Sequence, residues 1–132
     1  MNKITKETKQ LVQTIIDSLH EKKGIDVTSI KLAKLPDPIC EYFIICHGDS
    51  KPQVQALAES VIEKVKGKLG ITVWHKEGFE NAQWLLLDYA NVVVHIFQNE
   101  WRTFYKLEDL WADADTVNHS DNNINEKINN KL

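Results

Sequence analysis

The segment of residues 83–97, QWLLLDYANVVVHIF, constrains the fold of this chain more than any other part of the sequence. It fits two short strands joined by a two-residue turn at Ala90 and Asn91, because a three-residue loop would scatter charged and apolar side chains over both faces. Side chains alternate along a strand, so one face of this hairpin is predicted to pack beneath helices. That face carries Leu85, Leu87, Tyr89, Val92, Val94 and Ile96.

The opposite face of the hairpin mixes large aromatic groups with an acid and an imidazole. A plain hydrophobic core does not favour such a mixture. We therefore predict an open sheet face that serves as a binding surface. Its residues are Trp84, Leu86, Asp88, Val93, His95 and Phe97.

Length and composition predict one globular domain. The 132 residues are enough to close a single core, and 42% apolar with 27% charged residues is typical of a folded, water-soluble chain. No apolar run approaches the about 20 residues that a membrane helix needs, and the first ten residues lack the apolar stretch of a secretory signal. We expect a cytoplasmic protein with no membrane contact.

Charge is distributed unevenly along the chain. Residues 1–76 hold 12 lysines against 9 acids, whereas residues 77–115 hold eight acids against Arg102 and Lys106. Proteins that bind phosphate backbones cluster lysine and arginine, so direct nucleic-acid binding by the hairpin face is disfavoured. A basic protein partner fits this charge better. The alternative, acids that only keep the surface soluble, stays open on charge alone.

Hydrophobic spacing predicts a first helix capped by Thr5 and a second helix between Ser50 and Gly70. Strands are predicted over residues 25–32, 42–47, 71–78, 84–89 and 92–97. This order predicts an α/β domain over residues 1–115, with a mixed sheet of about five strands, two main helices and a short C-terminal helical segment. Residues 116–132 are rich in asparagine and are predicted to form a disordered tail.

The turn from Gly48 to Ser50 is the most enzyme-like feature, because a strand-to-helix turn can hold a phosphate. Nucleotidyl-transferring enzymes also need a pair of carboxylates on the next strand to hold metal ions, and here that strand offers only Glu77. Asp49 and Ser50 are therefore interpreted as helix caps, and no catalytic residue is predicted. A nucleotide-binding, nucleotidyltransferase-like enzyme remains the alternative hypothesis.

No cofactor or metal is predicted either. Cys40 and Cys46 match neither a redox pair nor a zinc framework and are interpreted as reduced, partly buried thiols. The histidines and acids also lack the spacing of a specific metal motif.

Aromatic residues continue through positions 97–111. Phe104, Leu107 and Leu110 are interpreted as a satellite core that holds the end of the chain on the sheet. About half of the other three large aromatic residues are predicted to be exposed for binding. These are Trp101, Tyr105 and Trp111.

Three motifs in this part of the chain resemble the ribosomal silencing factor family, also called Iojap-related. They are E-G-x-x-x-A-x-W-x-L-L-D-Y from Glu77, V-V-H-x-F from Val93 and F-Y-x-L-E-x-L-W from Phe104. The strand and helix entry YFIICHGDSKPQVQALAESVIEKV and the upstream KKGIDVTSIKL are similar to the family as well. The resemblance extends over about residues 11–115.

The resemblance implies a translation repressor that is not an enzyme. Such proteins bind the large ribosomal subunit on its fourteenth ribosomal protein, at the intersubunit face. They hinder joining of the small subunit and lower protein synthesis under nutrient limitation. The family fold is nucleotidyltransferase-like without the catalytic carboxylates, and members are often homodimers when free.

The resemblance also implies a partner-binding site. Tyr89 fits it least well, because the predicted register places Tyr89 on the packed face. A generic adaptor for another basic protein would use the same surface, and only the resemblance separates the two hypotheses. The implied site residues are Glu77, Trp84, Asp88, Tyr89, His95, Phe97, Phe104 and Tyr105.

Overall fold

A computed structural model describes residues 4–119 of the chain. The secondary-structure elements are α1 (Lys6–Glu21), β1 (Ile25–Lys31), β2 (Tyr42–Gly48), α2 (Lys51–Leu69), β3 (His75–Glu77), β4 (Trp84–Asp88), β5 (Val92–Gln98), α3 (Asn99–Tyr105), the 3₁₀ helix η1 (Leu107–Trp111) and β6 (Asp115–Asn118). None of the helices within residues 4–119 is both long enough and apolar enough to cross a membrane.

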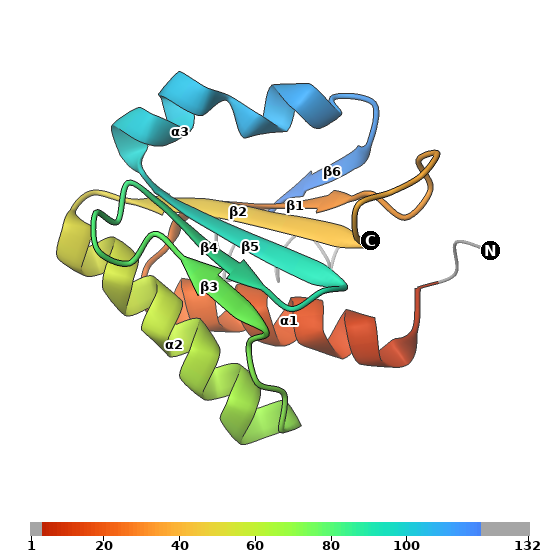
Figure 1. The fold of residues 1–132 in the computed structure, drawn as a ribbon, viewed down its shortest axis with the longest axis horizontal. Coiled ribbons are helices and arrows are strands. Elements are labelled where there is room, and N and C mark those ends of the chain that lie inside the picture. The colour runs from red at the N-terminus through yellow and green to blue at the C-terminus, as the bar shows by residue number, and fades with distance from the viewer. Residues whose placement is uncertain (1–3, 120–132) are drawn as a thin grey trace, which may run out of the picture.

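The strands form one mixed sheet in the order β3-β4-β5-β2-β1-β6. The central pair, β2 and β5, is parallel, and the other neighbouring pairs are antiparallel. Helices α1 and α2 lie against one face, whereas α3 and the segment after it cross the other face (Figure 1). The predicted mixed α/β fold is confirmed.

Both long helices begin at their predicted caps, and α2 also ends where predicted. Thr5 Oγ1 accepts a hydrogen bond from the Thr8 backbone N–H at 3.1 Å, and Ser50 Oγ accepts one from Gln53 N–H at 3.2 Å. Helix α2 ends at Gly70, whose φ of 71° is a left-handed conformation that glycine adopts without strain.

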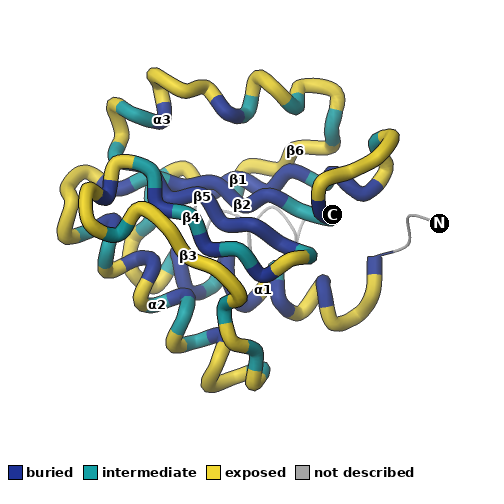
Figure 2. The backbone as a smooth tube through the Cα atoms, viewed as in Figure 1, coloured by how far each residue is buried: buried dark blue, intermediate teal, exposed yellow. Residues whose placement is uncertain are grey.

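The hairpin has the predicted register. Trp84 pairs with Phe97 and Asp88 with Val93, and the Tyr89 N–H donates to the Val92 carbonyl. The predicted inner face packs under α1 and α2 in one large core, and the central strands are buried along most of their length (Figure 2). A one-residue slip would turn this apolar set to solvent, so burial fixes the register.

The prediction of an open second face is wrong for the part of the sheet that β5, β2 and β1 form. The chain turns back after β5, and α3 and η1 cover β5, β2 and β1. Leu107 is buried there, and the rings of Phe43 and Trp111 meet edge to face at 5.7 Å. The cover needs only a few apolar residues at irregular spacing, which periodicity does not reveal. The β3–β4 part of this face stays open.

Two elements at the sheet edges also differ from prediction. The third strand is confined to three residues, His75–Glu77, and residues 71–74 are irregular. Strand β6, Asp115–Asn118, pairs with β1 where the tail was predicted to begin. All four β6 residues are exposed, so no apolar pattern marks a strand held by backbone hydrogen bonds. Residues 120–132 of the predicted tail lie outside the described residues.

We predict that Phe97→Ala lowers the free energy of unfolding by about 3–5 kcal/mol, because Phe97 is fully buried between the sheet and α3. Urea unfolding followed by circular dichroism measures the change. The control is Phe104→Ala, which removes an exposed phenyl ring and should shift stability by less than about 0.5 kcal/mol. Equal effects of the two variants would contradict the packing described here.

Candidate partner-binding site

The uncovered part of the second sheet face forms a patch that we call the open corner. The strand registers set His75 opposite Asp88 and Glu77 opposite Leu86. Alternation along β4 puts Trp84 on the same face. The open corner therefore combines one indole and one aliphatic side chain with ionisable groups. Its residues are His75, Glu77, Trp84, Leu86 and Asp88.

Aromatic rings extend the open corner onto α3. The centroid of the Trp84 ring lies 5.1 Å from the Phe97 centroid and 4.7 Å from the Tyr105 centroid. The Tyr105 centroid in turn lies 5.9 Å from that of Trp101 and 5.2 Å from that of Phe104. We call these five residues the aromatic cluster. It contains a buried base and an accessible rim, since Phe97 is fully buried whereas Tyr105 is 44% and Phe104 70% exposed.

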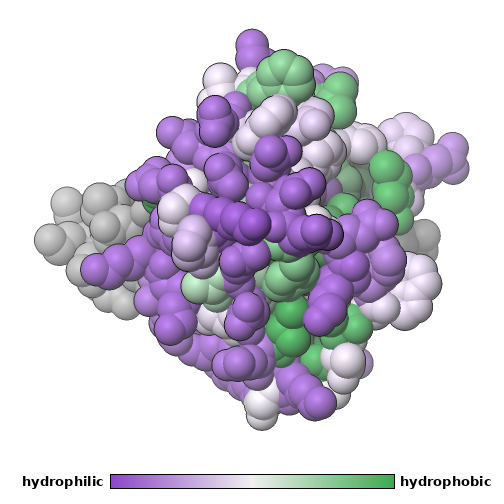
Figure 3. Space-filling model, turned by 60° about the vertical axis from the view of Figure 1, so that its left-hand side comes forward, coloured by the Kyte–Doolittle hydropathy of each residue, from purple (hydrophilic) through white to green (hydrophobic). Residues whose placement is uncertain are grey.

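Exposure of Phe104 and Leu110 shows that their assignment to a satellite core was wrong, and Leu107 alone of that set is buried. Much of the face shown in Figure 3 is hydrophilic, with separate apolar patches, one of them at the top where α3 lies. Exposed aromatic rings are typical of a protein-binding surface, and acids beside them favour a basic partner.

His95 lies beneath the site. It is 4% exposed, and its Nδ1 accepts a hydrogen bond of 3.0 Å from Trp84 Nε1. Burial lowers the pKa of His95 to about 4, so the imidazole is neutral at pH 7. Nδ1 as acceptor requires the hydrogen on Nε2, which has no partner among the described residues. His95 therefore orients the Trp84 indole from below and does not itself reach the surface.

Asp88 and Tyr89 hold the hairpin turn. Asp88 Oδ1 accepts a 2.7 Å hydrogen bond from the Ala90 N–H, which supports the positive φ of 73° at Ala90. Tyr89 is buried on the helix-covered face, where burial raises its pKa to about 12. The structure thus brings Glu77, Trp84 and the Phe104–Tyr105 pair together at the surface. His95 and Phe97 lie beneath them, and Tyr89 lies on the other side of the sheet.

A hollow of about 320 Å³ opens between β3 and β4. Glu77, Gly78, Trp84 and Leu86 line it. Gly78 has a φ of 86°, and a Cβ at this position would lie 2.2 Å from the Trp84 carbonyl oxygen. Only glycine lets the chain pass this close to β4, so the glycine of the first motif shapes the hollow.

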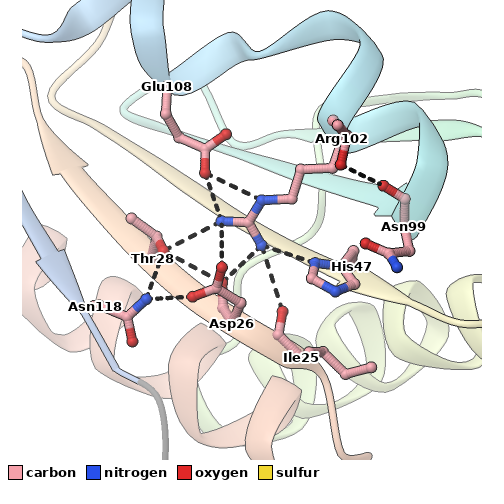
Figure 4. A network of polar contacts seen from close by, with 9 residues as sticks. Ile25, Asp26, Thr28, His47, Asn99, Arg102, Glu108 and Asn118 are labelled. Carbon is pink, nitrogen blue, oxygen red and sulfur yellow. Dashed lines mark hydrogen bonds and ion pairs between the residues drawn. The ribbon is translucent and has the colours of Figure 1, made fainter.

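Arg102 holds α3 in place, a role that its sequence context did not reveal. Its side chain is 7% exposed and lies among residues of β1, β2 and η1 (Figure 4). It donates to Glu108 Oε2 at 2.7 and 3.1 Å, to the Asp26 carbonyl at 2.7 Å and to Thr28 Oγ1 at 3.2 Å. The only signal in the sequence is that this is the sole arginine.

His47 completes the Arg102 contacts. Its Nδ1 lies 3.0 Å from the guanidinium, and burial together with the positive charge of Arg102 lowers its pKa. A neutral imidazole can accept from Arg102, whereas a protonated one cannot. With its donors directed at protein acceptors, Arg102 is a structural link rather than an anion site.

The turn before α2 is also occupied by the protein itself. The Asp49 N–H donates to Gln53 Oε1 at 2.8 Å, while Ser50 caps the helix. This geometry favours the predicted cap at Ser50 over a phosphate site, whereas Asp49 makes its contact through the backbone N–H and not as the predicted side-chain cap. Within residues 4–119, no three or more histidine, cysteine or acidic side chains gather as a metal site would require. Cys40 and Cys46 are unbridged and buried, and burial raises their pKa values to about 11 and about 12.

Fold and site together describe a mixed α/β domain with an aromatic and acidic candidate binding surface. A family model described as "Ribosomal silencing factor during starvation" matches residues 5–131. The chain is 40% identical over 108 residues to ribosomal silencing factor RsfS of Halalkalibacterium halodurans, covering 82% of this chain and 91% of the relative. It is 36% identical to the Bacillus subtilis protein of the same name over 80% of this chain and 88% of the relative.

Solved structures agree with these matches. A crystal structure from Chromobacterium violaceum superposes with a TM-score of 0.74 at 35% identity, covering 79% of this chain and 85% of that one. A second, from Bacillus halodurans, gives 0.70 at 37% identity, with 83% and 97% coverage. The chain therefore belongs to the ribosomal silencing factor family, as its motifs predicted.

We predict that Arg102→Gln lowers the free energy of unfolding by about 3 kcal/mol, because the half-buried Glu108 carboxylate loses its partner. Arg102→Lys should recover less than half of this loss, since one ammonium cannot reach Glu108, Thr28 and the Asp26 carbonyl together. Urea unfolding measures both variants, with Lys106→Gln as the exposed-cation control. An Arg102→Lys variant as stable as the wild type would contradict the proposed role.

Stability should also fall in mild acid because of His95. The unfolded chain binds a proton at an ordinary histidine pKa of about 6.5, whereas the folded chain resists it until about pH 4. The stabilising contribution is complete above pH 6.5 and is lost as the pH falls from about 6.5 to 4, by at most about 1.4 kcal/mol per unit. Urea midpoints at pH 7, 6 and 5 should decline more steeply for wild type than for His95→Gln. The lowered pKa values of His47 and His119 affect the wild type and the variant alike. Parallel curves would therefore show that His95 does not cause the loss of stability.

Proposed function

We propose that this chain is a cytoplasmic translation repressor that binds the large ribosomal subunit. Its partner would be the fourteenth large-subunit ribosomal protein, at the intersubunit face, and its binding would prevent joining of the small subunit under nutrient limitation. Membership of the ribosomal silencing factor family supports the ribosomal role. The names of its relatives are those of a regulatory factor.

The observation that carries the proposal is the exposed aromatic rim beside the acids of the open corner. Phe104, Tyr105 and Trp84 are large rings fixed on regular elements, which is the kind of group that anchors protein interfaces. The sole arginine of the acidic segment is buried and paired with Glu108. With this pair neutralised, the segment still carries seven acids against Lys106, which fits a basic ribosomal protein.

Steric exclusion follows from the geometry of such a complex. A specific interface needs only about 800 Å² on each partner. The open corner and the rim of the aromatic cluster lie on one side of the sheet, and helices α1 and α2 form a layer on the opposite side (Figure 1). A domain docked by this side would project its helical layer outward, into the space that a second subunit needs.

A homodimer of the free chain is part of the same proposal. The edge strand β3 has its three residues exposed, and Trp74 beside it is largely exposed as well. These groups give a second copy an unpaired strand edge and an apolar side chain to contact.

We predict that Trp84→Ala and Phe104→Ala each weaken binding to large ribosomal subunits by about 2 kcal/mol or more, because each removes an anchor ring. Co-sedimentation of purified protein with isolated large and small subunits measures the effect. Ile39→Ala, which removes an equally exposed apolar group from the loop between β1 and β2, serves as the control. Absence of pelleting with large subunits at modest salt would refute the proposed function.

A further inference from the structure

The hollow between β3 and β4 is large enough to admit one long side chain. Its volume of about 320 Å³ equals that of about ten water molecules. The Trp84 indole, the Leu86 side chain and the Glu77 carboxylate all line it. A ligand that enters it meets an aromatic surface and a negative charge together.

The indole wall is fixed before any partner arrives. Trp84 Nε1 donates a hydrogen bond to His95. The Trp84 ring also packs on Phe97 and Tyr105, with centroid separations of 5.1 and 4.7 Å. These contacts leave the indole little rotational freedom, so ordering it costs little on binding. Trp is also the side chain whose ring face attracts cations most strongly.

The charge of the hollow selects a cation. Glu77 is well exposed, and within residues 4–119 its carboxylate contacts only His75, at 3.0 Å through Oε1. Oε2 therefore remains available to a ligand. An anion such as a phosphate would be repelled by Glu77, which argues against nucleic acid as the occupant.

We propose that this hollow receives one arginine side chain of the partner protein. A planar guanidinium can stack on the indole while it donates to the Glu77 carboxylate, whereas a lysine ammonium cannot do both equally well. This inference rests on the proposed function and deepens it, because it makes the hollow a specificity-determining contact with a basic ribosomal protein.

The first test uses the whole ¹⁵N-labelled chain and N-acetyl-arginine amide at high millimolar concentration. The Trp84 indole N–H signal, identified by its loss in Trp84→Phe, should shift saturably. N-acetyl-citrulline amide, which has nearly the same shape without the charge, should leave it unmoved, and Glu77→Gln should abolish the arginine effect. Equal shifts with both compounds, or none with arginine, would overturn the proposal.

The second test measures binding to isolated large ribosomal subunits. Glu77→Gln should weaken binding about tenfold by removing the charge that faces the arginine. Glu80→Gln removes an exposed acid three residues away that does not line the hollow, and it should change binding less than twofold. Equal effects of the two variants on a protein that still binds would overturn the inference and leave the proposed function standing. Failure of the wild type to bind would refute the proposed function, and the arginine titration would still decide what the hollow recognises.

Discussion

One buried guanidinium determines which part of the sheet is covered and which part is open. Arg102 links α3 to η1 through Glu108 and to β1 through Thr28 and the Asp26 carbonyl. These contacts hold the C-terminal segment over β5, β2 and β1, and they leave β3 and β4 uncovered. The exposed rim of the aromatic cluster lies on the held segment. The candidate site therefore depends on a polar contact that lies outside it.

The same link also shapes the electrostatics. Residues 77–115 hold two basic residues, and one of them is withdrawn from the surface by its partners. Lys106 alone remains exposed there against the seven acids other than Glu108, and two of these, Glu77 and Asp88, lie in the open corner. Because Arg102 and Glu108 neutralise each other, the net charge of the segment stays the same, and burying the arginine stabilises the fold without weakening the attraction for a basic partner.

Periodicity in the sequence was sufficient for the hairpin, because a buried apolar face admits one register only. Caps at Thr5, Ser50 and Gly70 likewise follow from local chemistry. The sequence predicted that the segment after Phe97 would be held on the sheet, but not how much of the second face it covers, since that depends on where the chain turns after Phe97. Strand β6 was missed because its exposed side chains carry no burial pattern. The family motifs identified the surface residues Glu77, Trp84 and Phe104, but they could not separate them from the supporting residues His95 and Phe97.

The hairpin joins core and candidate site so tightly that neither can change alone. Leu85 and Leu87 point into the helix-covered core, while Trp84 and Leu86, their neighbours in the chain, line the hollow. The register that buries the first pair therefore fixes the spacing of the second. Gly78 extends this coupling to β3, because its missing Cβ lets Glu77 lie opposite Leu86. The relative positions of indole and carboxylate are thus set by the packing of the core, which is how a small domain can hold a binding site in shape on a short edge strand.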